Sequence, residues 1–339
     1  YLLVWVVVLG NVMAWLIQYL SAKLGIVTGE SLPEILGRRI RNHTARRAYW
    51  LQAELVAMAT DVAEIIGGAV ALWLLFGVPL VWGGLITGAV SIALLLIQSR
   101  RGARSFEFVI IGLMAIIVLG FTYGVFIGPP DASGVAGGLL PRFDGADSVL
   151  LAASILGATI MPHAIYAHSS LARDRFRPVD GRTRTDAAAA DAAIDTRRVL
   201  RATRWDVTIA LAIAGTVNLC ILLLAAANLD GVPGTDSLEG AYAALNAGIG
   251  PVVATLFAVG LLASGLASSA VGAYAGAEIM HGLLRVRIPL LARRLVTLVP
   301  ALAILAVGVD PTFALILSQV ILSFGIPFAL IPLVALTAK

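Results

Sequence analysis

The fold of this chain is decided by one stretch, Gly157-Ala158-Thr159-Ile160-Met161-Pro162-His163-Ala164-Ile165-Tyr166-Ala167-His168. It places a thioether, a proline and two histidines inside a segment that is apolar enough to cross a bilayer. Proline has no backbone N–H and clashes with the preceding turn, so the carbonyl groups near Ala158 and Thr159 are expected to lose their helical partners. Unpaired carbonyls beside the sulfur of Met161 predict a cation-binding break in a membrane helix.

The composition around this stretch is that of an integral membrane protein. Of 339 residues, 59% are hydrophobic and only 13% are charged, and the mean hydropathy is +0.94, far above that of a soluble domain. The net charge of +4 does not indicate nucleic-acid binding, because the arginines fall in loops between apolar runs. The single cysteine, Cys220, excludes a disulfide framework and a cysteine-rich metal cluster.

Apolar runs of about 20 residues predict nine transmembrane helices. The runs are too long and too uniformly apolar for barrel strands, so the expected fold is an all-α bundle. Residues 1–339 are expected to form a single transmembrane domain that includes a charged cytoplasmic linker at 172–204. The predicted spans are 1–26, 48–76, 79–98, 105–127, 147–171, 205–229, 251–283, 288–309 and 311–337.

Loop charges predict how these spans are oriented. The connections after the first, third, fifth and seventh spans are rich in arginine, and the alternate connections are short or acidic. Basic loops face the cytoplasm, so the span that contains Met161 runs from outside to inside. The small residues of the seventh span, at 264–276, favour close helix packing.

Three acidic residues lie within the second span. At 100° per residue, Glu54 and Asp61 fall about 20° apart and Glu64 about 60° further round, so all three share one face. A charge inside a bilayer is costly unless it meets a partner or water, which favours an ion or proton path; packing ion pairs are the alternative. Arg293 and Arg294 of the eighth span lie level with Glu54 and can reach towards Asp61. They point about 100° apart, so they are expected to contact different partners, and one of them could instead extend to the interface.

The remaining polar groups admit two interpretations each. His163 and His168 lie about 140° apart on a helix, so they are not a metal-binding pair; each is a proton shuttle or gate, or a hydrogen-bonded interior histidine. Met161 is either core filler or a soft ligand that prefers manganese, iron, cobalt or cadmium over calcium and magnesium. Gln319 lies in a last span predicted to be interrupted by Gly325, Pro327 and Pro332, and it offers either an amide oxygen to a cation or an interhelical hydrogen bond.

Four segments together, 157–163, 59–67, 25–34 and 315–328, closely resemble motifs of the Nramp divalent-metal transporters. The resemblance covers essentially the whole chain. It implies a LeuT-type inverted-repeat helix bundle whose first and sixth helices are unwound at mid-membrane, with the nine predicted spans as the family's second to tenth. It also implies roles for individual residues. The metal ligands would be Met161, Ala158 and Gln319, and the proton-linked network would be Asp61, Glu64, Glu54, His163, His168, Arg293 and Arg294.

The function implied by the resemblance is proton-coupled import of Mn²⁺ or Fe²⁺ by alternating access. Such a transporter is a multi-pass protein of the cell membrane, in a bacterium the inner membrane, and is not an enzyme. Its partners would be divalent metal ions, protons and the lipid bilayer, with no cofactor and no obligate protein partner. One alternative is a transporter of the same fold for a small organic substrate such as an amino acid. An intramembrane metalloenzyme is less favoured, because the sequence contains no His-Glu-x-x-His helix.

Two departures from the family pattern stand out. Ala164 replaces the asparagine that usually follows Pro-His, which is expected to alter packing more than coordination. The family's Asp-Pro-Gly-Asn motif, which supplies a carboxylate and an amide ligand on the first helix, is absent. Because the chain starts at Tyr1 inside an apolar run, we expect it to be truncated at both ends and to lack the first helix, so that it folds incompletely and binds metal weakly.

Overall fold

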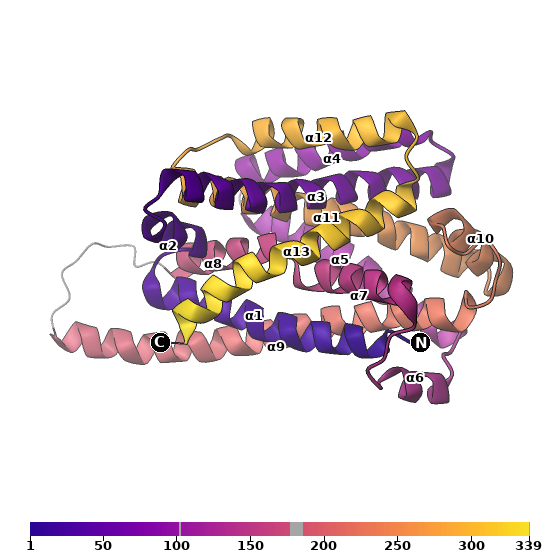
Figure 1. The fold of residues 1–339 in the computed structure, drawn as a ribbon, viewed down its shortest axis with the longest axis horizontal. Coiled ribbons are helices and arrows are strands. Elements are labelled where there is room, and N and C mark those ends of the chain that lie inside the picture. Colours follow the sequence, from indigo (N-terminus) through magenta and orange to yellow (C-terminus); the bar gives the residue numbers. More distant parts are fainter. Residues whose placement is uncertain (102, 177–185, 339) are drawn as a thin grey trace.

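The computed structural model describes residues 1–101, 103–176 and 186–338, and within these ranges the chain forms helices and no strand (Figure 1). This confirms the predicted all-α bundle. The helices are α1 (Val4–Thr28), α2 (Leu32–Arg39), α3 (His43–Phe76), α4 (Leu80–Arg101), α5 (Ala103–Ile127), α6 (Ala132–Gly138), α7 (Gly145–Ile160), α8 (Pro162–Phe176), α9 (Asp186–Asn228), α10 (Leu238–Gly248), α11 (Pro251–Leu284), α12 (Leu290–Val307) and α13 (Pro311–Thr337).

Most of the predicted spans are confirmed as helices that can cross a membrane. In the described part of the chain, 8 helices are long and apolar enough, with α7 and α8 counted together, and the apolar part of α4, Leu80–Leu94, is shorter. The predicted interruption of the last span is wrong, because α13 continues through Pro327 and Pro332. Neighbouring helices and local adjustments allow a membrane helix to tolerate the loss of one donor at each proline.

The predicted linker at 172–204 is largely helical. Helix α8 continues to Phe176 and α9 already begins at Asp186, while residues 177–185 lie outside the described part. The alanine-rich run at 187–193 explains the early start of α9, since alanine has the highest helix propensity. Within this segment, Arg173 is a buried residue of α8.

The two ends of the bundle agree with the alternation of loop charge. At one end, Arg173 near the end of α8 binds Glu34 of α2 and Glu278 of α11, so the helix ends next to three of the basic connections meet there. At the other end the backbone N–H of Leu238, at the start of α10, donates to Thr312 of α13. Figure 1 shows α2 at one end of the molecule and α6 and α10 at the opposite end.

The centre of the bundle is α3, which packs most extensively against α11. Small residues of α11 make this contact possible, as predicted. A Cβ atom added to Gly265 would lie 2.9 Å from the carbonyl oxygen of Glu64, and one added to Gly272 would lie 3.0 Å from an oxygen of the Asp61 carboxylate. The glycines therefore bring the helices together and also make room for the acidic side chains of α3.

Candidate cation site at the helix break

The predicted break lies at Met161, between α7 and α8. Met161 has φ 43 and ψ 90, a conformation that costs a residue with a side chain about 1–3 kcal/mol. Its N–H still donates to the carbonyl of Gly157 and its own carbonyl accepts from the N–H of Ala164. Because Pro162 has no N–H, the carbonyl of Ala158 has no intrahelical donor four residues later. The sequence stretch that predicts the fold therefore forms a bent joint with a free acceptor.

A cavity of about 200 Å³ opens beside this joint. Met161 and Ala158 from the break line it together with Gln319 of α13, so the three predicted metal ligands share one space. Glu64 of α3 lines the same cavity, which adds a carboxylate to the sulfur and the oxygen donors. The other lining residues are Thr60, Ala63, Gly67, Leu261, Ser264, Gly265, Ser268 and Leu315.

A glycine fixes the distance between the break and α13. A Cβ atom added to Gly157 would lie 1.9 Å from the backbone carbonyl oxygen of Gln319, closer than any Cβ contact in proteins. Only a residue without a side chain lets α7 and α13 approach so closely. Gly157 thus allows Gln319 to reach the cavity. The side-chain amide nitrogen of Gln319 donates a hydrogen bond to Ser318 Oγ at 3.1 Å.

Two adjacent arginines of α12 form ion pairs with the acidic face of α3. Arg293 Nη1 lies 2.6 Å from Glu54, and Arg294 Nη1 lies 2.8 Å from Asp61. The two arginines contact different partners, as their 100° offset predicts. Both are buried, so the alternative in which one of them extends to the interface is wrong. A guanidinium group that is removed from water needs a carboxylate partner, and α3 supplies one for each.

Glu64 is the least satisfied of these carboxylates. Its nearest approach to Arg294 is 3.6 Å, which is an ion pair without a hydrogen bond. Neither of its oxygens has a hydrogen-bond partner among the described residues, although the side chain is buried. An unsatisfied buried carboxylate is costly unless a cation or a proton reaches it. Glu64 is therefore the group at the cavity that a bound cation or a proton would stabilise most.

The two histidines have separate surroundings. His163, the second residue of α8, lies with its Nδ1 3.1 Å from the hydroxyl of Thr60, a cavity residue on α3. His168 lies 2.7 Å from the amide oxygen of Gln18 on α1. The structure therefore brings His163 to the cavity and the acidic face of α3 and directs His168 to a different neighbour. This agrees with their predicted separation around the helix.

Sequence reasoning missed part of this site. Ser264 and Ser268 of α11 line the cavity, although only packing was predicted for them. It also missed the buried cluster around Arg173, because arginines near span ends were all assigned to orientation. A signal was available: Ser31 and Glu34 have the spacing of a capping box, which fixes one carboxylate of that cluster. In the described part of the chain, no three or more His, Cys, Asp or Glu side chains are grouped to hold a metal ion.

Comparisons with known proteins agree with this geometry. The family model Natural resistance-associated macrophage protein-like (Nramp) matches residues 1–339. A protein of Mycobacterium tuberculosis (strain CDC 1551 / Oshkosh) named divalent metal cation transporter MntH is 60% identical over 340 residues, which are 100% of this chain and 76% of that protein. The protein of the same name from Bacillus subtilis (strain 168) is 46% identical over 342 residues, covering 100% of this chain and 77% of the relative.

Solved structures give the same result for the fold. A crystal structure of a mutant of the Eremococcus coleocola manganese transporter matches with a TM-score of 0.82 and 34% sequence identity, covering 98% of this chain and 72% of that chain. Another, in complex with an aromatic bis-isothiourea substituted compound, matches with a TM-score of 0.82 and 33% identity. The LeuT-type fold expected from the sequence is therefore shown. With the match to the family model over its whole length, this multi-pass membrane chain belongs to the Nramp family, and the relatives described above are named divalent metal cation transporters.

Proposed function

We propose that this protein imports divalent transition-metal ions, Mn²⁺ or Fe²⁺, together with protons, by alternating access. The observation that carries the proposal is one cavity lined by both Met161 and Glu64, whose buried carboxylate has no hydrogen-bond partner among the described residues. A thioether favours softer dications and a carboxylate supplies charge, so the pair selects transition metals over calcium and magnesium. The names of the relatives, divalent metal cation transporter and manganese transporter, support the same substrate class.

In this proposal the metal ion is the transported substrate. Met161, the carbonyl of Ala158 and the amide of Gln319 supply donors, since all three line the cavity. Glu64 would offset the charge of the ion. An amino-acid substrate is less suitable, because its carboxylate would face the negative charge of Glu64 in a space of about 200 Å³.

The proton route in this proposal follows the face of α3. Glu64 lies beside Arg294, which also binds Asp61, and Glu54 follows with its own partner Arg293. His163 joins the route through Thr60. We place His168, which is bonded to Gln18 of α1, beside this route and not within it. Carboxylates and histidines that face a membrane interior in this way are typical of proton relays.

The proposal is tested by transport measurements on the reconstituted protein. Proteoliposomes are loaded at neutral pH, diluted into acidic or neutral buffer, and followed for Mn²⁺ entry and for internal acidification. We expect Mn²⁺ entry in both buffers, faster with the acidic exterior, and a matching inward flow of protons. Absence of Mn²⁺ entry under every gradient would overturn metal transport, whereas Mn²⁺ entry without proton movement would overturn coupling alone. Liposomes without protein provide the background.

Replacing Met161 by alanine is expected to weaken the discrimination between Mn²⁺ and Ca²⁺. The change removes the only soft donor among the described residues that line the cavity and leaves oxygen donors, which do not favour transition metals. We expect the ratio of Mn²⁺ to Ca²⁺ uptake to fall about tenfold, equivalent to about 1.4 kcal/mol. The ratio is measured by competition in the same proteoliposomes.

Two further variants control this experiment. Met114→Ala removes a methionine of α5 that is 37% exposed and does not line the cavity, so the ratio should stay unchanged. Met161→Cys keeps a sulfur at the break and should retain part of the discrimination. If Met161→Ala excludes Ca²⁺ as well as the unaltered protein does, the sulfur does not determine selectivity.

A further inference from the structure

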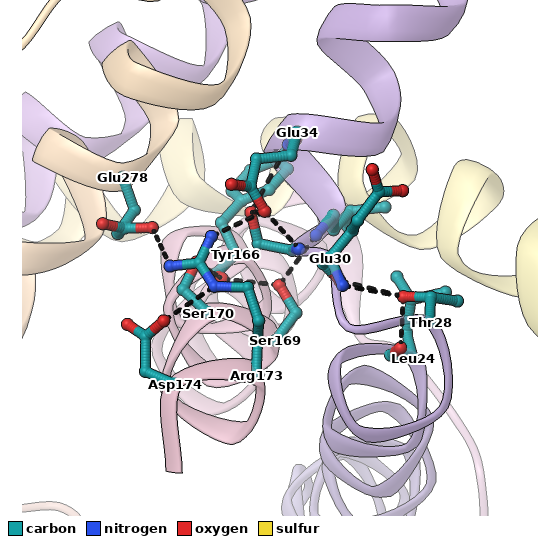
Figure 2. Close-up of polar contacts among 12 residues, drawn as sticks. Leu24, Thr28, Glu30, Glu34, Tyr166, Ser169, Ser170, Arg173, Asp174 and Glu278 are labelled. Carbon is teal, nitrogen blue, oxygen red and sulfur yellow. Dashed lines mark hydrogen bonds and ion pairs between the residues drawn. The ribbon is translucent and has the colours of Figure 1, made fainter. Parts of the chain in front are cut away.

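A second buried charge cluster lies at the cytoplasmic end of α8, away from the cavity. Its centre is Arg173, whose side chain is only 8% exposed. Figure 2 shows the guanidinium group between three carboxylates that come from three directions. Arg173 lies 2.6 Å from Glu34 of α2, 2.8 Å from its neighbour Asp174, and 3.1 Å from Glu278 of α11.

The carboxylate of Glu34 is held in place by Ser31 as well as by Arg173. Ser31 caps α2, and its backbone N–H donates to Glu34 Oε2 at 2.7 Å while the hydroxyl of Ser31 accepts from the Glu34 N–H. Partial burial alone would raise the pKa of Glu34, but the bonds from Ser31 and Arg173 outweigh it and hold that pKa below its usual value. With its pKa lowered, Glu34 stays ionised at neutral pH and loses its charge only as the pH falls through the lowered pKa. The ion pair between Glu34 and Arg173 is therefore present at neutral pH.

The helices around the cluster touch through their backbones. A Cβ atom added to Gly37 of α2 would lie 2.1 Å from the carbonyl oxygen of Gly282 on α11, and one added to Gly25 of α1 would lie 2.2 Å from the carbonyl oxygen of Ser169 on α8. The Ser169 hydroxyl also accepts a hydrogen bond from the N–H of Leu32, at the start of α2. Backbone contacts therefore join α2 to α11 and α1 to α8 at this end. Arg173 and its three carboxylates line a pocket of about 380 Å³ between these contacts, so the charge cluster and not dense packing bridges the helices there.

Helix α8 connects this end of the molecule to the cavity. It starts at Pro162, directly after the break, and Arg173 lies in its last turn. The joint at Met161 separates α8 from α7 and so has the position of a hinge, since hinges lie at the ends of such elements. Any tilt that moves its cytoplasmic end away from α2 and α11 must separate Arg173 from Glu34 and Glu278.

The exposures of the four side chains suit a contact that opens and closes. The arginine is almost fully buried, whereas the side chains of Glu34, Asp174 and Glu278 are 30%, 49% and 18% exposed. Carboxylates that already touch water exchange the arginine for water at modest cost, whereas a fully buried pair does not. Such a cluster can stabilise the contact of α8 with α2 and α11 and still allow that contact to break.

We propose that Arg173, Glu34, Asp174 and Glu278 form a charge latch that holds α8 against α2 and α11 and keeps the cytoplasmic side of the cavity closed. Release of the latch frees α8 to tilt at Met161 and opens the cavity towards the cytoplasm. The latch rests on the proposed function only in that the cavity is the transport site, since its main readout is the labelling rate of a cysteine, which does not depend on transport.

The test follows the reactivity of a cysteine placed behind the latch. Cys220→Ser removes the single native cysteine, and Ser170→Cys introduces a thiol at a fully buried position of α8 whose hydroxyl donates only a 3.2 Å bond to the Tyr166 carbonyl. A membrane-impermeant maleimide is added from the cytoplasmic side. We expect Arg173→Gln to raise the labelling rate at least about tenfold, because a higher open population exposes the thiol in proportion.

Arg38→Gln is the matched control. Arg38 pairs with Glu30 at the same end of the molecule, but its side chain is 63% exposed, so its loss should leave labelling unchanged. Glu278→Gln removes one of the three carboxylates and should give a labelling rate between those of the control and Arg173→Gln. If Arg173→Gln does not fold, the labelling rate of Glu278→Gln tests the latch instead. Equal labelling of the folded Arg173→Gln or Glu278→Gln protein and the control would overturn the latch. Loss of Mn²⁺ uptake in every variant, the control included, would instead count against the proposed function.

Discussion

Replacing Arg294 by methionine is expected to destabilise the protein by about 3–5 kcal/mol, because it strands two buried carboxylates without their shared cation. The Arg294 guanidinium is 1% exposed and lies 2.8 Å from Asp61 and 3.6 Å from Glu64. Methionine fills a similar volume, so the loss measures the charge and not a cavity. The apparent unfolding temperature in detergent, taken at a fixed heating rate, is the readout.

Two comparisons make this prediction specific. Arg38→Met breaks an exposed ion pair with Glu30 and should cost about 0–1 kcal/mol. Adding Asp61→Asn to Arg294→Met removes one of the stranded charges and should recover part of the lost stability, although each change alone destabilises. If the double variant is instead as unstable as the sum of the two single variants, the pair is not coupled and the assignment is wrong.

Replacing Gly157 by alanine is expected to reduce Mn²⁺ uptake by about tenfold or more, because a small displacement of donors at a binding site has a large effect on the rate. The added Cβ atom would lie 1.9 Å from the backbone oxygen of Gln319. Neither helix can relieve this contact by rotating a side chain, so α7 and α13 must separate. Separation moves Gln319 away from Met161. The added methyl group also overpacks the interface between α7 and α13, at a cost of about 1–3 kcal/mol in stability.

The control for this prediction is another helical glycine. A Cβ atom on Gly112 of α5 meets nothing within 4 Å, so Gly112→Ala should keep both uptake and unfolding temperature. Initial rates of Mn²⁺ entry into proteoliposomes with equal amounts of each protein give the comparison. Normal uptake by Gly157→Ala would mean that the spacing between α7 and α13 does not matter for transport.

Much of the architecture follows from local properties of the sequence. Apolar runs mark the spans because backbone groups in lipid must be satisfied within a helix. Pro162 marks the break because it removes a donor at a known position. Glu54, Asp61 and Glu64 share a face because the period of a helix is fixed. The last span shows the limit of such reasoning, since Pro327 and Pro332 do not end α13 where its neighbours support it.

The pairing of the charged groups could not be derived in this way. The sequence places Arg293 and Arg294 at the depth of Glu54, but only the packing of α12 on α3 decides that both are buried and that Glu64 keeps two oxygens without hydrogen bonds. The ion pairs of Arg173 could not be predicted from the sequence for the same reason. An arginine near the end of a span has the same local pattern whether it faces lipid headgroups or three carboxylates.

The sequence by itself therefore determined most of the membrane-spanning helices, the break at Met161 and the chemical types available there, because each depends on residues that are neighbours along one helix. The tertiary structure alone decided that Met161, Glu64 and Gln319 share a cavity and that Arg173 joins α2, α8 and α11. Those contacts join residues far apart in the chain. They depend on close approaches at glycines such as Gly157, whose partners no local pattern encodes.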